Sequence, residues 1–203
     1  MTDQELEAKK QEFLDIWDTH VKRPGADRLR SYLLADQNDF FTAPASTRYH
    51  GAYAGGLLEH SLNVYHNLKA YLERERVHKV YSFPEYTEET IAICALLHDL
   101  CKMNFYTVDY RNAKNSQGVW EKVPFYKIDD RLPYGHGEKS VLMIQFFMHL
   151  HREEAMAIRW HMGFSGPEDK GTIGAALEMF PLAFALHVAD MEASYFLEGR
   201  EAI

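Results

Sequence analysis

The amino-acid sequence predicts an all-α fold, a bundle of helices interrupted by a single inserted β-hairpin. Apolar residues recur at helical spacing through most of the chain, starting with residues 3–20. The exception is a stretch at about 104–128, where apolar and polar residues alternate on either side of a turn-rich centre, as in two antiparallel strands. Because neither an internal repeat nor a linker interrupts this pattern, we expect one domain over 1–203, with N-terminal helices at 1–47, a functional core at 48–198 and the hairpin as an insert at 104–128.

The first two helices are marked by an amphipathic pattern and by a proline. Leu6, Phe13 and Trp17 share one face of the segment at 3–20. Pro24 is expected to start the next helix, because proline is tolerated in a first turn, where no amide donor is needed. The sequence at 40–56, FFTAPASTRYHGAYAGG, is rich in small residues and is expected to form a loop.

The remaining helices follow from periodicity and from end signals. A long helix is expected at 57–77, with charges gathering towards its end. Thr87, followed by two glutamates, has the features of an N-cap, so TEETIAICALLHDLCK is expected to be helical as far as Lys102. After the hairpin and a loop, helices are expected at about 138–151, 152–162, 171–179 and 181–198.

The composition limits the classes of partner. Hydrophobic residues make up 46% of the chain, enough to bury a core without disulfides or other staples. The chain has 22 Lys and Arg against 30 Asp and Glu, a net charge of −8. Proteins that bind long nucleic acid without regard to sequence rely on a basic surface, so this partner is not expected. A short nucleotide bound at a metal ion remains compatible with the charge, because the ion supplies positive charge locally.

The cysteines and the polar start of the chain favour a cytoplasmic protein. Cys94 and Cys101 fall in one expected helix about 10 Å apart, too far for a disulfide, and no zinc motif has their spacing. The first residues, MTDQELEAKKQEF, lack the apolar core of a signal peptide. The most apolar stretch, PLAFALHVADM, is too short to span a bilayer. We therefore expect reduced thiols, a soluble protein and no membrane partner.

Three apolar segments share an unusual feature, because each leads into ionisable residues. IAICALL runs directly into His98 and Asp99, PLAFALHVADM surrounds Asp190, and GAYAGGLL precedes His60. A buried carboxylate without a partner costs several kcal/mol or changes its protonation state. Two such acids beside histidines require a shared positive partner, and a divalent metal ion satisfies them with the fewest assumptions. A buried polar network without a metal is the alternative.

Lys102 is placed to act beside such a metal. It follows His98 by four residues and Asp99 by three, so on a helix it projects towards the same site. A cation next to a metal suits a phosphate oxygen or another anionic group. Arg48 and His50, which precede the glycine-rich turn, are further candidates for substrate binding, with a surface position as the alternative.

Taken together and in this order, the motifs resemble the HD-domain metal-dependent phosphohydrolase superfamily, whose ligands run His, His-Asp, often two more His, and a distant Asp. The matching segments are GGLLEHS with His60, ALLHDLCK with His98 and Asp99, GHGEKS with His136, RWHMG with His161, and LHVADMEAS with Asp190. The phrase YHGAYAGGLLEHSLNV is especially similar to the HD domain of YhaM-type exoribonucleases. His187, three residues before Asp190, is expected to support the site rather than to bind the metal.

The resemblance implies a metal-dependent phosphohydrolase that cleaves a phosphoester of a nucleotide or small phosphorylated molecule with metal-activated water. It implies one or two divalent ions of Mn, Fe, Co, Ni or Zn. We expect Asp99, as a metal ligand, and Lys102, as a cation that offsets charge on the phosphate, to be the catalytic residues. Lys102 stands where mononucleotide-cleaving HD nucleotidases place a catalytic acid, so their mechanism does not carry over. The barrel that precedes the HD domain in YhaM-type enzymes has no counterpart before Arg48, so exoribonuclease activity does not follow either.

Other functions remain open at this point. A few HD-fold proteins with a similar ligand set are di-iron oxygenases, and a regulatory module that holds a metal without turnover is a third alternative. The hairpin aromatics could close over a ligand, or they could form a dimer contact, so a homodimer is one expectation. These aromatics are Phe105, Tyr106, Tyr110, Trp120 and Tyr126.

Overall fold

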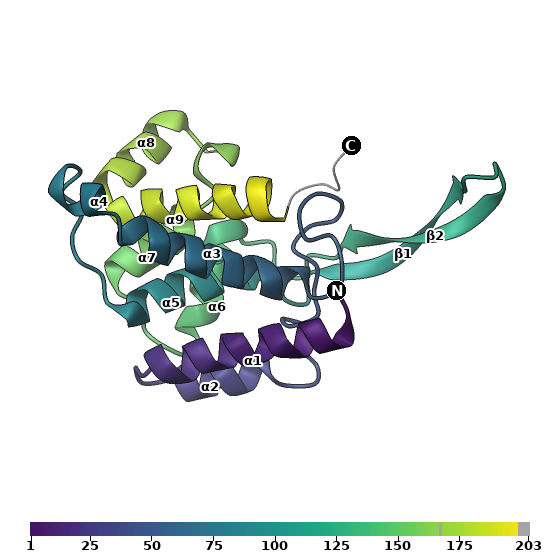
Figure 1. Cartoon of the computed structure of the whole chain (residues 1–203), viewed down its shortest axis with the longest axis horizontal. Coiled ribbons are helices and arrows are strands. Elements are labelled where there is room, and N and C mark those ends of the chain that lie inside the picture. Colours follow the sequence, from purple (N-terminus) through teal and green to yellow (C-terminus); the bar gives the residue numbers. More distant parts are fainter. Residues whose placement is uncertain (167, 199–203) are drawn as a thin grey trace.

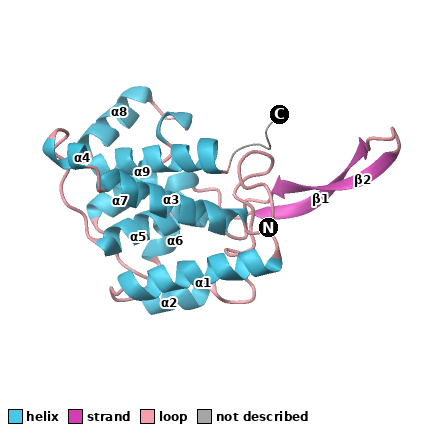
Figure 2. Cartoon of the chain, viewed as in Figure 1, coloured by secondary structure: helices cyan, strands magenta, loops and turns pink. Residues whose placement is uncertain are grey.

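Helices make up most of this computed structural model, which describes residues 1–166 and 168–198. Figure 1 shows the helices packed into one body from which a single hairpin projects. Within the described residues, the two strands of this hairpin form the one sheet, and Figure 2 shows them in magenta. The fold is therefore mainly helical, and the predicted all-α class holds except for the inserted hairpin, which was itself expected.

The bounds of the elements are as follows. The helices are α1 (Asp3–His20), α2 (Ala26–Leu33), α3 (Gly56–Leu72), α4 (Glu75–Lys79), α5 (Glu88–Leu97), α6 (His136–Gln145), α7 (Arg152–Trp160), α8 (Lys170–Met179) and α9 (Pro181–Glu192). Two 3-10 turns, η1 (Leu100–Lys102) and η2 (Gly163–Ser165), and a π-helical turn, η3 (Ala193–Leu197), complete the helical segments. The strands are β1 (Tyr106–Lys114) and β2 (Trp120–Ile128).

The centre of the body is formed by α3 and α5. Every residue of α5 from Thr90 to Leu97 is buried, and α3 buries most of its length. Helix α5 packs against α1, α3 and α7, while α3 also contacts α9. Because α5 is apolar on all sides, it can only be stable when other helices surround it. The polar residues that follow it are therefore brought into the interior of the protein.

The N-terminal helices agree with the sequence patterns except at one start. The predicted helix at 3–20 is confirmed, and its N-cap Thr2 forms a capping box with Glu5. The second helix begins at Ala26 rather than at Pro24, because Gly25 turns the chain with φ 96° and serves as the N-cap. A Cβ atom at Gly25 would lie 1.9 Å from the carbonyl oxygen of Phe147, so only glycine fits this close approach.

Two predicted helices are shorter than expected. The helix predicted at 57–77 ends at Leu72, where the ring of His78 lies 2.7 Å from the Leu72 carbonyl oxygen and satisfies the helix end. The helix predicted to reach Lys102 ends at Leu97, because Asp99 leaves helical geometry with φ −104° and ψ 20°. A 3-10 turn then carries Lys102.

The C-terminal helices are correct in number and order within the described residues, but their bounds differ. The helix predicted at 138–151 runs from His136 to Gln145, so His136 lies at a helix start rather than in a loop. The helix predicted at 181–198 changes at Ala193 to a π-helical turn that ends at Leu197. Thr87 is confirmed as the N-cap of α5, because its hydroxyl accepts a hydrogen bond from the amide of Thr90.

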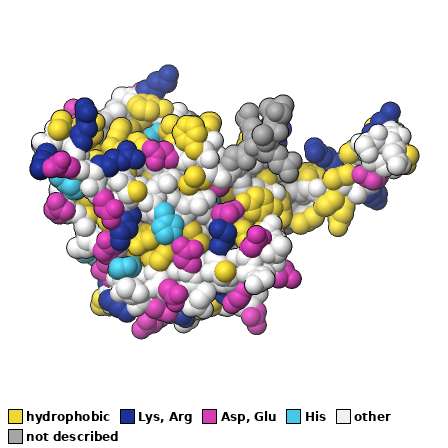
Figure 3. Space-filling view, in the orientation of Figure 1, with side chains coloured by type: hydrophobic (Ala, Val, Ile, Leu, Met, Phe, Trp, Pro, Cys, Tyr) yellow, Lys and Arg dark blue, Asp and Glu magenta, His cyan; other side chains and the backbone are white. Residues whose placement is uncertain are grey.

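The predicted hairpin is confirmed, and it is amphipathic. Strands β1 and β2 pair antiparallel from Tyr106 opposite Ile128 to the turn end, where Lys114 faces Trp120. Alternation places Tyr106, Tyr110 and Trp120 on one face, and the last two are 61% and 65% exposed. Hydrophobic side chains are visible along the hairpin in Figure 3. Contact between this face and a second copy of the chain stays a prediction.

No single helix among the described residues is long and apolar enough to cross a membrane. Within these residues, α8 and the segment Pro181–Leu197 are long and apolar enough only when taken together, and the chain bends by 109° between them.

A buried ion pair ties the N-terminal helices to the core. Glu154, 1% exposed at the start of α7, accepts hydrogen bonds from both terminal nitrogens of Arg23, at 2.6 and 2.8 Å. It also accepts from the hydroxyl of Thr90 and the amide of His151, each at 2.8 Å. Burial would raise the pKa of Glu154, but these hydrogen bonds outweigh it and hold the pKa below its ordinary value.

We predict that Glu154→Gln lowers the free energy of unfolding by about 3 kcal/mol at pH 7, because it removes the more buried of the two carboxylates that pair with the Arg23 guanidinium and leaves only the longer contact to Glu89. A lowered pKa means that the pair stabilises the protein above about pH 4.5 and that this stabilisation is lost as the pH falls further. Urea unfolding at pH 7 and at progressively lower pH measures both effects. Asp18→Asn, which breaks the exposed pair with Arg30, is the control and should cost less than about 1 kcal/mol. An equal cost for the two variants would contradict the role of the buried pair.

Candidate metal centre

The six predicted metal ligands come together at one place between the helices. They lie on α3 (His60), at the end of α5 (His98 and Asp99), at the start of α6 (His136), at the end of α7 (His161) and on α9 (Asp190). Five separate segments therefore contribute to the cluster, which explains why the ligands are spread over most of the sequence.

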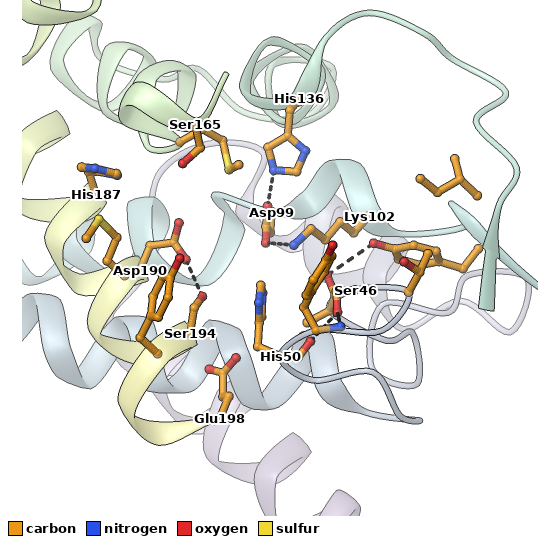
Figure 4. Close-up of a pocket in the computed structure, with 18 residues that line it drawn as sticks. Ser46, His50, Asp99, Lys102, His136, Ser165, His187, Asp190, Ser194 and Glu198 are labelled. Carbon is orange, nitrogen blue, oxygen red and sulfur yellow. Dashed lines mark hydrogen bonds and ion pairs between the residues drawn. The ribbon is translucent and has the colours of Figure 1, made fainter. Parts of the chain in front are cut away.

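Asp99 lies at the middle of this cluster and is 2% exposed. One of its carboxylate oxygens is 2.7 Å from Nε2 of His136 and 3.5 Å from Nε2 of His161. The other is 2.6 Å from the ammonium of Lys102. Figure 4 shows Asp99 between His136 and Lys102, with an interaction to each. The two oxygens of this carboxylate therefore face different groups of the cluster.

His60 forms the second half of the cluster from the opposite side. Its Nε2 lies 3.1 Å from Nε2 of His98, 3.2 Å from a carboxylate oxygen of Asp190 and 3.5 Å from Asp99. Ligand atoms that converge in this way define two triads, His60 with His98 and Asp99, and His98 with His161 and Asp190, whose atoms lie within 4.8 Å of one another.

The orientation of two histidines is fixed by the helices that they end. His98 and His161 are the C-cap residues of α5 and α7, and the Nδ1 of each lies 2.8 or 2.7 Å from the carbonyl oxygen three residues earlier, on Ala95 and Ile158. Only a protonated Nδ1 can donate to a carbonyl, so in the neutral form of each ring Nε2 carries the lone pair, and it faces the cluster.

His161 supplies the test of whether a metal fits. Its Nε2 atom is completely buried and has no hydrogen-bond partner among the described residues. A buried polar atom without a partner is rare and needs an explanation. An ion held by imidazole nitrogen and carboxylate oxygen supplies that partner, and this donor set suits divalent transition metals. The residues present therefore fit a metal ion.

The charges in the cluster favour a cation. Burial opposes ionisation of Asp99, but Lys102, His98 and His136 lower the pKa of this carboxyl well below its ordinary value. The pKa of Asp190 is also lowered, against the effect of burial, by His60 above all. Both carboxylates are therefore ionised at neutral pH and attract positive charge. Burial would lower the pKa of His60, but hydrogen bonds to Asp190 and Glu198 raise it to about 10, so a metal ion that binds at Nε2 would displace a proton from this ring.

A cavity of about 740 Å³ opens onto the cluster. Asp99, Lys102, His136 and Asp190 line it, so the cavity gives solutes access to both carboxylates. Its outer wall contains Tyr106 and Ile128, which places the base of the hairpin beside the site. The tip of the hairpin projects away from the body in Figure 1.

The other two predicted substrate-binding residues, His50 and Arg48, differ in their positions relative to the cavity. His50 lines the cavity, and its Nε2 is buried without a hydrogen-bond partner among the described residues. Arg48 is exposed, its guanidinium donates to the hydroxyl of Tyr49 at 2.9 Å, and it does not line the cavity. The structure therefore brings His50, but not Arg48, to the site.

Three further residues at the site were not predicted as ligands. Nδ1 of His187 donates to the carbonyl oxygen of His161 over 2.7 Å, so His187 supports the neighbouring ligand. The thiol of Cys101, expected only as a core residue, lies 3.4 Å from Nδ1 of His136. Glu198 lies against His60, and the sequence offered no motif that singles it out.

The comparisons with known proteins agree with this arrangement. The model of the HD domain matches residues 57–191, which include every one of the six clustered residues. The chain belongs to the HD domain family, a superfamily of generally metal-dependent phosphohydrolases. Comparison with curated proteins gives no match, and neither does comparison with solved structures.

We predict that Asp99→Ala loses bound metal, because the Asp99 carboxylate is the group that contacts both halves of the cluster. Elemental analysis of the purified variant against wild type measures this. Asp109→Ala, which removes an exposed carboxylate on the hairpin, is the control and should keep the wild-type metal content. A folded Asp99→Ala protein with full metal content would show that the assignment is wrong.

We also predict about two ions per chain, because six converging ligands exceed what one catalytic ion takes while leaving room for water. His136→Ala should reduce the stoichiometry to about one, since its ring contacts only the Asp99 side of the cluster. Mass spectrometry of the intact metal-loaded protein under native conditions counts the ions. A wild-type protein that binds a single ion at saturation would contradict the two-metal arrangement.

Proposed function

We propose that this protein is a metal-dependent phosphohydrolase that cleaves a phosphoester of a nucleotide or small phosphorylated molecule. One observation supports this above all. The ammonium of Lys102 lines the same cavity as the carboxylates of Asp99 and Asp190, so one cavity combines a metal-binding cluster with a cation for an anionic substrate.

The ligands in this proposal are the six clustered residues. They are His60, His98, Asp99, His136, His161 and Asp190. Bound divalent ions would lower the pKa of a coordinated water towards neutrality and polarise the phosphoryl oxygens. The side chains that surround the cluster would bind and orient the phosphoester.

Lys102 is the first of these side chains. Although burial opposes its charge, Asp99 raises the pKa of Lys102 above its ordinary value, so its ammonium is protonated at neutral pH. The ammonium contacts Asp99 and has further donors for a phosphate oxygen. A fixed cation in a site that excludes water stabilises charge that develops on the phosphoryl group.

Two more polar groups line the cavity, one from the hairpin and one from the loop before α3. Burial raises the pKa of Tyr106 to about 12, so its hydroxyl is protonated, and it donates to the carbonyl oxygen of Ala45 at 3.3 Å. The buried Nε2 of His50 is available to a substrate group. Together with Lys102 these groups would orient a polar substrate towards the cluster.

The size and walls of the cavity favour a small molecule. Its volume of about 740 Å³ lies in the range of ligand pockets. Apolar surfaces from Tyr49, Met162, Met191 and Tyr195 complete the walls, next to the charged cluster. A nucleotide or similar molecule, with a phosphate at one end and a flat or apolar part at the other, matches this division. The net charge of −8 disfavours a long polyanion.

A di-iron oxygenase is the second candidate. The observation that favours it is the donor set of four imidazoles and two carboxylates, which also suits iron. A mixed-valent di-iron signal in spectroscopy of anaerobically purified protein would support it. If the protein is instead a regulatory module that holds the metal without turnover, it will bind metal and show neither hydrolase nor oxygenase activity. The likeness to YhaM-type exoribonucleases rests on the motif around His60 alone.

We predict that Lys102→Ala keeps its metal but loses phosphoester hydrolysis by about a hundredfold, because the cation at the transferring phosphate contributes a few kcal/mol to the transition state. The assay is hydrolysis of an aryl phosphodiester and a panel of nucleotides with Mn²⁺, Co²⁺, Ni²⁺, Zn²⁺ or Mg²⁺. Lys127→Ala, on the exposed hairpin, is the matched control and should be unchanged.

Two results would contradict this proposal. If wild type cleaves a substrate and Lys102→Ala matches its rate, Lys102 has no role in anion binding. If fully metal-loaded wild type cleaves none of the substrates, the phosphohydrolase function loses its support, and the oxygenase becomes the leading candidate.

A further inference from the structure

The carboxylate of Glu198 is buried directly behind the first histidine of the cluster. Both of its oxygens lie 3.0 Å from Nδ1 of His60, and its side chain is 1% exposed. Glu198 lies outside the segment 57–191 that matches the HD domain, and it belongs neither to the six predicted ligands nor to the groups that would bind substrate. Its burial against a ligand needs its own explanation.

The two nitrogens of His60 face different partners. Among the described residues, the hydrogen-bond partner of Nδ1 is the Glu198 carboxylate, and a carboxylate accepts, so Nδ1 carries the proton when the ring is neutral. Nε2, on the other side of the ring, then keeps its lone pair and faces His98, Asp99 and Asp190. We propose that Glu198 is a positioning residue that fixes the tautomer and orientation of His60 and strengthens it as a metal ligand.

This role rests on the proposed metal centre, and it makes His60 different from its neighbours. The rings of His98 and His161 are oriented by backbone carbonyl oxygens, which are neutral acceptors. His60 lies in the middle of α3, where the carbonyl oxygens of the preceding turn are already used by the helix. It therefore needs a side-chain acceptor, and an anionic one makes the imidazole more basic.

The π-helical turn η3 explains how Glu198 reaches this position. Glu198 follows Asp190 by eight residues, so a continued α-helix would rotate it roughly 80° away from the Asp190 face. A π-helix has wider turns, with bonds to the fifth residue, and rotates less per residue. The amide of Glu198 accordingly bonds to the carbonyl oxygen of Ala193 at 3.0 Å, and its side chain points back to the cluster, as Figure 4 shows.

Asn63 holds the same carboxylate from a second direction. It lies three residues after His60 on α3, and its side-chain amide donates to Glu198 at 3.0 Å. The acceptor is thus held in place by a residue of the same helix that carries His60.

The alternative is that Glu198 itself binds a cation. His50, His60 and Glu198 offer three atoms within 4.8 Å of one another. If an ion occupied this place, Nδ1 of His60 would bind it in place of donating to Glu198. The number of ions per chain separates the two arrangements, because a positioning residue changes the affinity and a ligand changes the count.

The experiment is titration of metal-free, full-length protein with Co²⁺, followed by its visible absorption bands and by native mass spectrometry. Glu198→Ala should weaken Co²⁺ binding by about 10–100-fold with no change in the number of ions at saturation. Glu198→Gln keeps an acceptor oxygen and should fall between Glu198→Ala and wild type. Asn63→Ala should shift the affinity in the same direction by less. Glu192→Ala removes an exposed carboxylate from α9 and should bind as wild type does.

Several results would overturn the proposal. Folded Glu198→Ala or Glu198→Gln that binds Co²⁺ as wild type does, with only its thermal stability reduced, would show a structural role alone. Loss of one ion at saturation in Glu198→Ala and also in His50→Ala would make Glu198 a ligand. If Glu198→Ala does not fold, Glu198→Gln decides the matter. Wild-type protein that binds no Co²⁺ would overturn the metal centre itself and, with it, the role of Glu198 as a positioning residue.

Discussion

Two carboxylates buried between helices, Asp99 and Asp190, impose the constraint on which the rest of the structure depends. Each is ionised although burial opposes its charge, so positive charge must lie within contact distance. Lys102 and the surrounding imidazoles supply part of it. The remaining acceptor atoms converge on one space, where an unpaired nitrogen of His161 has no protein partner among the residues described. The simplest arrangement that satisfies all of these groups contains metal ions, and the family to which the chain belongs is consistent with it.

The helices are built so that their ends deliver the ligands. Helices α5 and α7 are each followed by a C-cap histidine whose Nδ1 donates to a carbonyl oxygen of the last turn, which aims Nε2 at the cluster. The metal-binding side chains can converge only where the neighbouring residues pack closely. At Gly163, directly after the end of α7, φ is 51° and a Cβ atom would lie 2.5 Å from the ring of His187. Only glycine lets His187 approach and hold the carbonyl oxygen of His161. The apolar residues of the core therefore fix the distances within the site as well as the stability of the fold.

Much of this arrangement was predictable because local patterns of apolar and polar residues determine it. An apolar helix that runs straight into His98 and Asp99 indicates burial of ionisable groups whatever the fold, and alternation at 104–128 indicated the hairpin. The parts that were not predictable depend on tertiary contacts. The end of α3 at Leu72 depends on the ring of His78, which lies beyond the helix. Glu198 follows three exposed apolar residues, and its burial results from a π-helical turn that no sequence pattern predicts. Arg48 and His50 are two residues apart, yet only the backbone of their loop decides which of them lines the cavity.

We propose that imidazoles and carboxylates of this chain hold a pair of metal ions, and X-ray absorption at the metal edge of the Co²⁺- or Zn²⁺-loaded protein measures this coordination directly. We expect nitrogen and oxygen ligands at about 2.0–2.2 Å with the multiple-scattering signature of several imidazoles. We also expect a second metal at about 3.5–4 Å. A spectrum that shows only oxygen ligands without imidazole scattering, from protein that is folded and loaded, would contradict this metal centre.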